Sequence, residues 1–226
     1  MSTVVGTQNY SDAFATVLPF FMNSVKLAVF SVVGVLAVAS LAGYAFARLR
    51  FRGKSVLFGV VLATSIVPQI VYLLPQYAFF QELGWIDTQY PLWIPRALTP
   101  VFGTFLLRQA FATLPKELED AARLDGCSTF QIFWRVMLPQ VKPALATVGV
   151  FTFVESWNDL FGPLIFINST ELQTLPLALS LFQGEFFTTI STLMAASTIT
   201  ILPVLIVYAF AQRYFVEGIA SSGLRG

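Results

Sequence analysis

Long stretches without a charged residue are the feature that most constrains this chain. A helix needs about 20 apolar residues to cross about 30 Å of hydrocarbon. Three uncharged stretches reach that length, at residues 27–47, 55–81 and 186–212. Two weaker stretches, residues 91–111 and 144–167, are apolar apart from a few polar side chains. The sequence therefore predicts an all-α integral membrane protein, a polytopic helical bundle with five spans.

The composition excludes several other classes of protein. Hydrophobic residues make up 56% of the chain and charged residues 11%, against about 25% charged residues in an ordinary soluble domain. A net charge of +1 gives no electrostatic reason for a nucleic-acid partner. The absence of histidine removes the usual general base and the commonest metal ligand. We therefore expect no enzyme, and no catalytic or metal site, in this chain.

Loop charges predict the orientation of the spans. All but two of the 13 lysines and arginines lie in or beside the loop after the first span, the loop after the third span, or the C-terminal tail. Because positive loops stay in the cytoplasm, we expect the N-terminus outside and the C-terminus inside. One transmembrane domain over residues 1–226 is expected. It either begins with a short outer tail or lacks a span that would precede it.

The polar segment 113–143 lies between the third and fourth spans and is long enough to suggest a function. Pro115 suits the first turn of a helix, and acidic residues follow it where the helix dipole favours them. Leu118, Ala121 and Ala122 make a small apolar face. Gly126 fits the position just past a helix end. A short helix over residues 115–125 is predicted.

A second helix is predicted after this glycine. Ser128 and Gln131 have the spacing of a capping box. We expect the helix to end at Leu138-Pro139, because the residue before a proline avoids the helical region. The two helices form a hairpin, which either docks a partner through its small side chains or only connects two spans.

The segment 117–126, Glu-Leu-Glu-Asp-Ala-Ala-Arg-Leu-Asp-Gly, followed by Leu138-Pro139, resembles the cytoplasmic EAA loop of permease subunits of binding-protein-dependent ABC importers. Asp120 stands where this motif has glutamate, which keeps the charge but shortens its reach. Further segments are similar to the sugar permeases of the maltose and oligosaccharide type, at residues 44–49, 155–164, 174–177, 193–196 and 212–218. Members usually have six spans, and the five predicted here match the second to the sixth.

The resemblance implies a carbohydrate importer made of two permeases, two cytoplasmic ATPase subunits and an extracellular solute-binding protein. It would lie in the cytoplasmic (inner) membrane of a bacterium or archaeon. ATP and Mg²⁺ would be bound by the ATPase subunits, and this chain would hold no cofactor. Its first loop helix would be the coupling helix, with its alanines packed in an ATPase cleft and its acids facing basic groups. The residues implied in this coupling are Glu117, Asp120, Ala121, Ala122, Asp125, Gly126, Leu138 and Pro139.

Polar residues inside the predicted spans are candidates for the substrate pathway. Glu155 and Asp159 share one helix face, and Asn158 and Trp157 lie between them. Carboxylates and amides bind sugar hydroxyls, and an indole can stack on a sugar face. The structural alternative is that a carboxylate caps a broken helix at Gly162-Pro163 or pairs with Arg96 or Arg108.

The second span also carries a polar interruption. Thr64, Ser65, Pro68 and Gln69 lie near its middle. A proline frees a backbone carbonyl, so a kink is predicted there, and Gln69 is a further pathway candidate.

Two alternatives in function remain at this level. The same ABC machinery would also serve for glycerol phosphate esters or polyols. A self-contained secondary transporter would instead use Glu155 and Asp159 as a proton relay, and its likeness to the coupling loop would be accidental.

Overall fold

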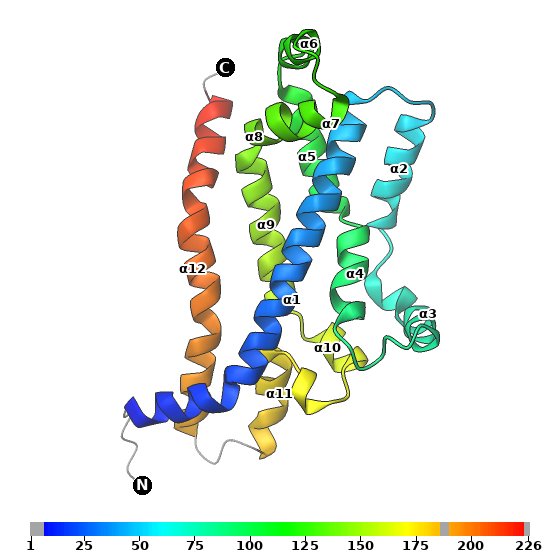
Figure 1. Cartoon of the computed structure of the whole chain (residues 1–226). Helices are drawn as coiled ribbons and strands as arrows, with labels where there is room; N and C mark the ends of the chain where they lie inside the picture. Colours follow the sequence, from blue (N-terminus) through cyan, green and yellow to red (C-terminus); the bar gives the residue numbers. More distant parts are fainter. Residues whose placement is uncertain (1–6, 186–189, 224–226) are drawn as a thin grey trace. The chain divides into compact units, whose positions relative to one another are not determined.

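The computed structural model describes residues 7–185 and 190–223, and these are helical without any β-strand (Figure 1). The prediction of an all-α protein is confirmed. The elements, in chain order, are α1 (Thr7–Arg48), α2 (Lys54–Thr64), α3 (Gln69–Glu82), α4 (Tyr90–Leu98), α5 (Val101–Thr113), α6 (Glu117–Leu124), α7 (Thr129–Gln131), the π-helix η1 (Ile132–Met137), α8 (Leu138–Gln140), α9 (Lys142–Trp157), α10 (Phe161–Phe166), the 3₁₀-helix η2 (Thr170–Leu172), α11 (Leu175–Glu185) and α12 (Ile190–Gly223).

Among the described residues, α1 alone is long and apolar enough to cross a membrane unbroken, over Phe14–Arg48. The predicted span at residues 55–81 consists of α2 and α3, which meet at an angle of 94°. The predicted kink at Pro68 is thereby confirmed. The predicted spans 91–111 and 144–167 are likewise divided, into α4 with α5 and α9 with α10. A proline lies in or shortly after each break, at Pro68, Pro100 and Pro163, and a proline disfavours helical geometry in the residue before it.

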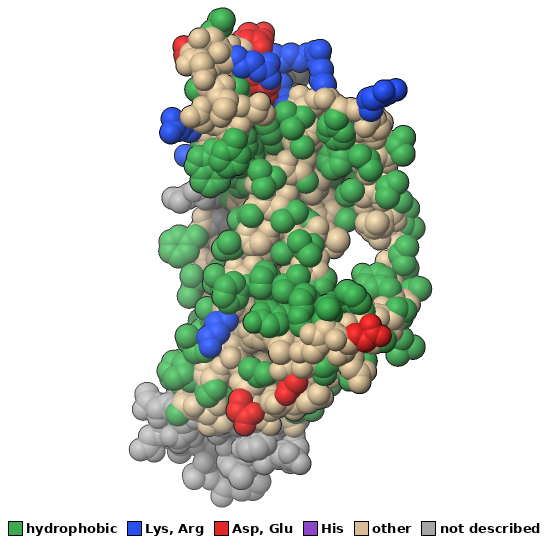
Figure 2. Space-filling model, turned by 45° about the vertical axis from the view of Figure 1, so that its right-hand side comes forward, with side chains coloured by type: hydrophobic (Ala, Val, Ile, Leu, Met, Phe, Trp, Pro, Cys, Tyr) green, Lys and Arg blue, Asp and Glu red, His purple; other side chains and the backbone are tan. Residues whose placement is uncertain are grey.

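The side chains of α2 explain why this helix needs a membrane or a second protein around it. No residue of α2 is buried, although the helix is almost entirely apolar. Large exposed apolar residues continue through the break, at Ile66, and into α3, at Ile70, Val71 and Leu74. Figure 2 shows hydrophobic side chains over much of the visible face. Such a surface is stable against lipid or protein but not against water.

The contacts divide the chain into two units, which are described separately. The first comprises residues 1–31, 74–95 and 152–210, and the second comprises residues 32–73, 96–151 and 211–226. In the second unit, α1 and α5 approach closely at small residues. A Cβ at Gly103 would lie 3.0 Å from the Cβ of Ala39, and one at Gly43 would lie 2.9 Å from the Cβ of Leu107. Small residues are what allow helix backbones in membranes to come this near.

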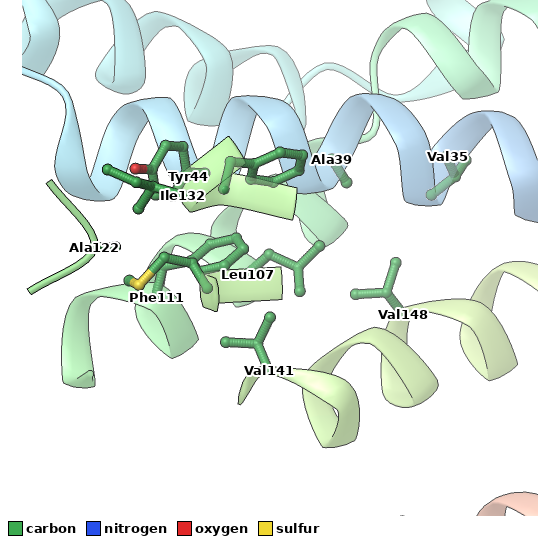
Figure 3. Packing of buried hydrophobic residues seen from close by; sticks show 11 residues of the cluster. Val35, Ala39, Tyr44, Leu107, Phe111, Ala122, Ile132, Val141 and Val148 are labelled. Carbon is green, nitrogen blue, oxygen red and sulfur yellow. The ribbon is translucent and has the colours of Figure 1, made fainter. Parts of the chain in front are cut away.

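The core of the second unit also includes the polar loop. Tyr44, Phe111 and Phe133 contact one another through their rings, with centroids 5.3–6.3 Å apart. Ala122 of α6 is buried in the same cluster (Figure 3). The helices α6 and η1 therefore pack onto the ends of α1 and α5 rather than forming a detached hairpin.

Candidate functional site

The helix α6 ends as its sequence predicts. Gly126 has a φ of +80°, in the left-handed region where glycine has no steric penalty. The Gly126 N–H donates to the carbonyl of Arg123, and the Cys127 N–H donates to the carbonyl of Ala122, each at 3.0 Å. These two bonds form the Schellman motif. They stop α6 sharply and leave its outer face unobstructed at the end.

The two alanines of the motif differ in burial. Ala122 is buried in the chain's own core, together with the partly buried Leu118. Ala121 is exposed. An α-helix turns by about 100° per residue, so the two alanines point in different directions. A partner of α6 can contact Ala121, whereas Ala122 holds α6 to this chain.

The outer face also contains a residue that the sequence analysis missed. Leu124, three positions after Ala121, has 90% of its surface exposed. Residues three apart are neighbours on a helix surface. An exposed leucine beside an exposed alanine, on a helix with acidic residues, is a small apolar contact surface. In the sequence, Leu124 could have been found by its spacing of three residues from Ala121, which places both on one side of the helix.

Acidic residues surround this apolar contact surface. Glu117, Asp120 and Asp125 are all exposed. Asp120 forms an ion pair with Arg123 of the same helix, with the nitrogen and oxygen 3.5 Å apart. Surface pairs of this kind are worth about 0–1 kcal/mol, so Asp120 can exchange its partner at little cost.

A fourth acid, Glu119, was missed. It is buried beside Arg48, at the end of α1. From the sequence, Arg48 is an orientation signal and part of the segment 44–49 that resembles the sugar permeases, with no indication of a partner at Glu119. The available signal was that Glu119 lies on the side of α6 that also carries Leu118 and Ala122.

The predicted capping box is present. The Gln131 N–H donates to Ser128 Oγ, and the Ser128 N–H donates to the Gln131 side chain. The aromatic residues that follow differ in burial. Phe133 is buried, whereas Phe130 and Trp134 are exposed.

The predicted end of this helix at Leu138-Pro139 is wrong. Leu138 has helical φ and ψ values, and the helix continues to Gln140. The Leu138 N–H donates to the carbonyl of Phe133, five residues earlier. This π-helical spacing widens the turn and accommodates Pro139, whose ring would meet the carbonyl four residues earlier in a regular α-helix. Leu138 is half-buried against the core, and Pro139 is exposed.

The pathway candidates of the first unit differ in their surroundings. Trp157 is only 1% exposed. Its ring packs against Phe21 and Phe153, and its Nε1 donates to the carbonyl of Thr200 at 3.1 Å. This conformation leaves no face of the indole free for a sugar. Trp157 is a core residue here.

Asp159 acts as a cap, as the structural alternative predicted. The Gly162 N–H donates to Asp159 Oδ1 at 3.0 Å, at the beginning of α10. A Cβ at Gly162 would lie 2.8 Å from Asp159 Oδ2, so the glycine makes room for this carboxylate. Asn158 is exposed and donates its amide to the carbonyl of Val154 at 2.9 Å.

Two pathway candidates are exposed at breaks in apolar helices. The side chain of Glu155 is exposed on α9, just before the break that follows Trp157. In the second unit, Gln69 is exposed at the first residue of α3. Both remain predictions as contacts of a substrate.

Comparison with known proteins identifies the family. Residues 36–221 match the family described as the binding-protein-dependent transport system inner membrane component. The chain belongs to this family. It is therefore a membrane permease subunit of a transport system, and not an enzyme. The sequence resemblance to sugar permeases of the ABC importers is confirmed by relatives with such names.

Two relatives and one solved structure show what the chain is similar to in sequence, and a second solved structure shares its fold. The arabinooligosaccharide transport permease AraQ of Bacillus subtilis is 35% identical over 99% of this chain and 80% of its own length. The trehalose/maltose transport permease MalG of Thermococcus litoralis is 31% identical over 92% of this chain and 75% of its own. A bacterial ABC transporter for the import of alginate, an acidic polysaccharide, matches with a TM-score of 0.82, 26% identity, and coverage of 92% and 79%. The methionine ABC transporter MetNI shares the fold alone, with a TM-score of 0.63, 15% identity, and coverage of 87% and 93%.

Proposed function

We propose that this chain is a permease subunit of an ATP-driven carbohydrate importer, in which α6 is the coupling helix. The observation that carries the proposal is the exposed face of α6, formed by Ala121 and Leu124 beside acidic residues. A small residue next to a protruding leucine suits a shallow cleft with one apolar pocket. The acids favour a basic rim on the partner. Figure 2 shows acidic and basic side chains at the end of the visible face where α6 lies.

The partner of α6 would be one of two cytoplasmic ATPase subunits, and ATP and Mg²⁺ would be bound there. A second permease and an extracellular solute-binding protein would complete the importer. The coupling residues of this chain would be Glu117, Asp120, Ala121, Asp125 and the missed Leu124, with Gly126 ending the helix. Ala122, Leu138 and Pro139 would support the position of α6 from within the chain. This assignment places α6 and the C-terminus in the cytoplasm.

A carbohydrate cargo is supported by the relatives, whose names refer to arabinooligosaccharides, trehalose and maltose, and lactose. Polar groups at the helix breaks suit such a cargo. Glu155 and Asn158 are exposed within an apolar segment, and a carboxylate in this position is costly against lipid. We infer that they face water or protein, where they would accept and donate hydrogen bonds to hydroxyl groups.

The break between α2 and α3 supports an equivalent role for Gln69 in the second unit. Residues 65–69 are exposed. Irregular backbone in a membrane must be covered by protein or line an aqueous cavity, because lipid cannot satisfy its carbonyls. We infer that this break faces the pathway or a partner permease.

Glycerol phosphate esters and polyols remain the alternative cargo. The secondary-transporter alternative has less support, because it needs two free carboxylates for its relay. Asp159 is engaged in capping α10, and the family is one of binding-protein-dependent systems.

The test is purification of the chain from its native membrane in mild detergent, followed by mass spectrometry. We expect an ATPase subunit and a second permease to copurify. The solute-binding protein is then titrated with arabinotriose, maltotriose, lactose and glycerol 3-phosphate. Tight binding of an oligosaccharide supports the proposed cargo, and tight binding of glycerol 3-phosphate selects the alternative. A chain that purifies alone and transports in vesicles without ATP contradicts the proposal.

A further inference from the structure

A buried ion pair joins α6 to the end of α1. Arg48 Nε and Glu119 Oε1 lie 3.5 Å apart, and each side chain is only 7% exposed. Arg48 is the last residue of α1, and Glu119 lies in the first turn of α6. Neither residue was among those implied in coupling. Because buried charges are costly unless they are paired, this pair fixes which side of α6 faces the chain.

Arg48 also holds the end of α5. Its Nε donates to the carbonyl of Phe111 at 3.0 Å, and its Nη2 donates to the carbonyl of Leu114. These carbonyls belong to the last turn of α5 and its cap, where helix carbonyls commonly lack an intrahelical partner; that of Phe111 also accepts the Leu114 N–H at 3.3 Å. A single guanidinium therefore connects α1, α5 and α6. Only arginine offers enough donors in a fixed planar arrangement to do this.

The contact between Arg48 and Glu119 is ionic rather than tightly hydrogen-bonded. Glu119 Oε1 has no hydrogen-bond partner within the described part of the chain. Its other oxygen lies 3.5 Å from Arg123 Nη2. The buried hydroxyl of Tyr44, one turn before Arg48, also has no hydrogen-bond partner among the described residues. In Figure 3 this hydroxyl lies at the end of the cluster nearest Ala122 of α6.

This arrangement can hold α6 while it shifts. The attraction between two charges falls only with the inverse of distance, whereas a hydrogen bond weakens steeply when its geometry is distorted. A larger separation would leave the buried carboxylate of Glu119 with only the half-exposed Arg123 as a charged partner, which is unfavourable. A displacement of α6 is therefore passed on to the end of α1 instead of breaking the contact.

We propose that Arg48 and Glu119 are positioning residues that tie the coupling helix to the end of α1, so that both move together when an ATPase subunit moves α6. The inference rests on the proposed function, because it takes α6 as the element that the ATPase moves. It adds a pair of residues inside the permease to those that contact the partner.

The test uses the full importer in lipid nanodiscs. ATP hydrolysis is measured with and without the solute-binding protein loaded with arabinotriose, and the ratio of the two rates reports coupling. Glu119→Gln removes the charge with almost no change of shape. Arg48→Lys keeps the charge but cannot serve α5 and α6 at once. We expect each variant to assemble into the importer. The stimulation ratio of each variant should be at least about fivefold lower than that of the wild type, which is within the usual range of coupling between sites.

Arg52→Lys is the matched control, because Arg52 is exposed in the loop that follows α1. We expect it to keep the wild-type ratio. A wild-type ratio in assembled Glu119→Gln and Arg48→Lys overturns the inference and leaves the proposed function intact. Failure of both variants to assemble also overturns it, because the pair would then serve folding alone. A wild-type complex without any stimulation contradicts the proposed importer itself.

Discussion

Gly43 of α1 lies so close to α5 that a Cβ at this position would be 2.9 Å from both the Cβ of Leu107 and the backbone nitrogen of Arg108. Because one of these neighbours is backbone, the side chains cannot simply turn away. The contact between α1 and α5 therefore depends on the absence of a side chain at position 43. The same contact also helps to position α6. Arg48, which holds the end of α5 and contacts Glu119 of α6, lies five residues after Gly43 on α1.

We expect Gly43→Ala to lower the free energy of unfolding by about 1–3 kcal/mol, as is typical of overpacking. The measurement is thermal unfolding of the purified chain in detergent. Gly59→Ala is the control, because nothing lies within 4 Å of a Cβ built there. An alanine in the interior of a helix is better than glycine by about 0.5–1 kcal/mol, so this control should be neutral or stabilising. Equal stability of the two variants would contradict the close approach.

Ala121 and Ala122 allow the inner and outer faces of α6 to be tested separately. We expect Ala121→Leu to change stability by less than about 0.5 kcal/mol, as for an exposed position, and to weaken copurification of the ATPase. Ala122→Leu should cost about 1–3 kcal/mol of stability because it overfills the core. The measurements are thermal unfolding and recovery of the ATPase subunit from the same preparations. The assignment of faces fails if the two variants exchange these effects.

Trp157 can be tested as a core residue. We expect Trp157→Ala to cost about 3–5 kcal/mol of stability because it leaves a cavity. Trp157→Phe keeps most of the packing and removes the bond to Thr200, which should cost about 1 kcal/mol. Uptake by the phenylalanine variant should keep its sugar specificity. A changed specificity at unchanged stability would instead indicate a sugar-stacking role in another state of the transporter.

The contact between Asp87 and residues 168–169 should depend on pH. Its carboxylate accepts hydrogen bonds from the Ser169 hydroxyl and from the N–H groups of Ser169 and Asn168. The hydroxyl bond first, and then the two backbone bonds, lower the pKa of Asp87 below its usual 3.8. A carboxyl group whose pKa is lower in the folded state stabilises the fold at a pH above its unfolded-state pKa. This stabilisation is lost as the pH falls through the folded-state pKa.

The measurement for Asp87 is hydrogen exchange at Asn168 and Ser169, corrected for the intrinsic rates. Protection should be constant near neutral pH and fall below about pH 4. Asp87→Asn removes the charge but suits the positive φ of 59° at this position, because asparagine tolerates the left-handed region. This variant should exchange faster near neutral pH and lose the dependence on pH. Identical profiles for both proteins would contradict the role of the carboxylate.

The sequence by itself determined the local features and the class of the protein. Its uncharged stretches indicated membrane helices, and Pro68 indicated the bend between α2 and α3. Gly126 and the pair Ser128 and Gln131 marked helix ends correctly. The helix-end signals are reliable because each depends on contacts between residues at most five positions apart. The family was recognisable from such short segments as well.

Only the tertiary structure decided which of these residues face the chain's own core. Whether Ala122 or Ala121 is buried depends on α1 and α5, and so does the burial of Glu119. The partner carbonyl of Arg48 at Phe111 lies 63 positions away, a separation at which no local pattern specifies a contact. The same holds for Trp157, whose bond to Thr200 spans 43 positions. Burial depends on the neighbours that pack against a residue. Helical periodicity shows which residues share a face, but not which face is buried.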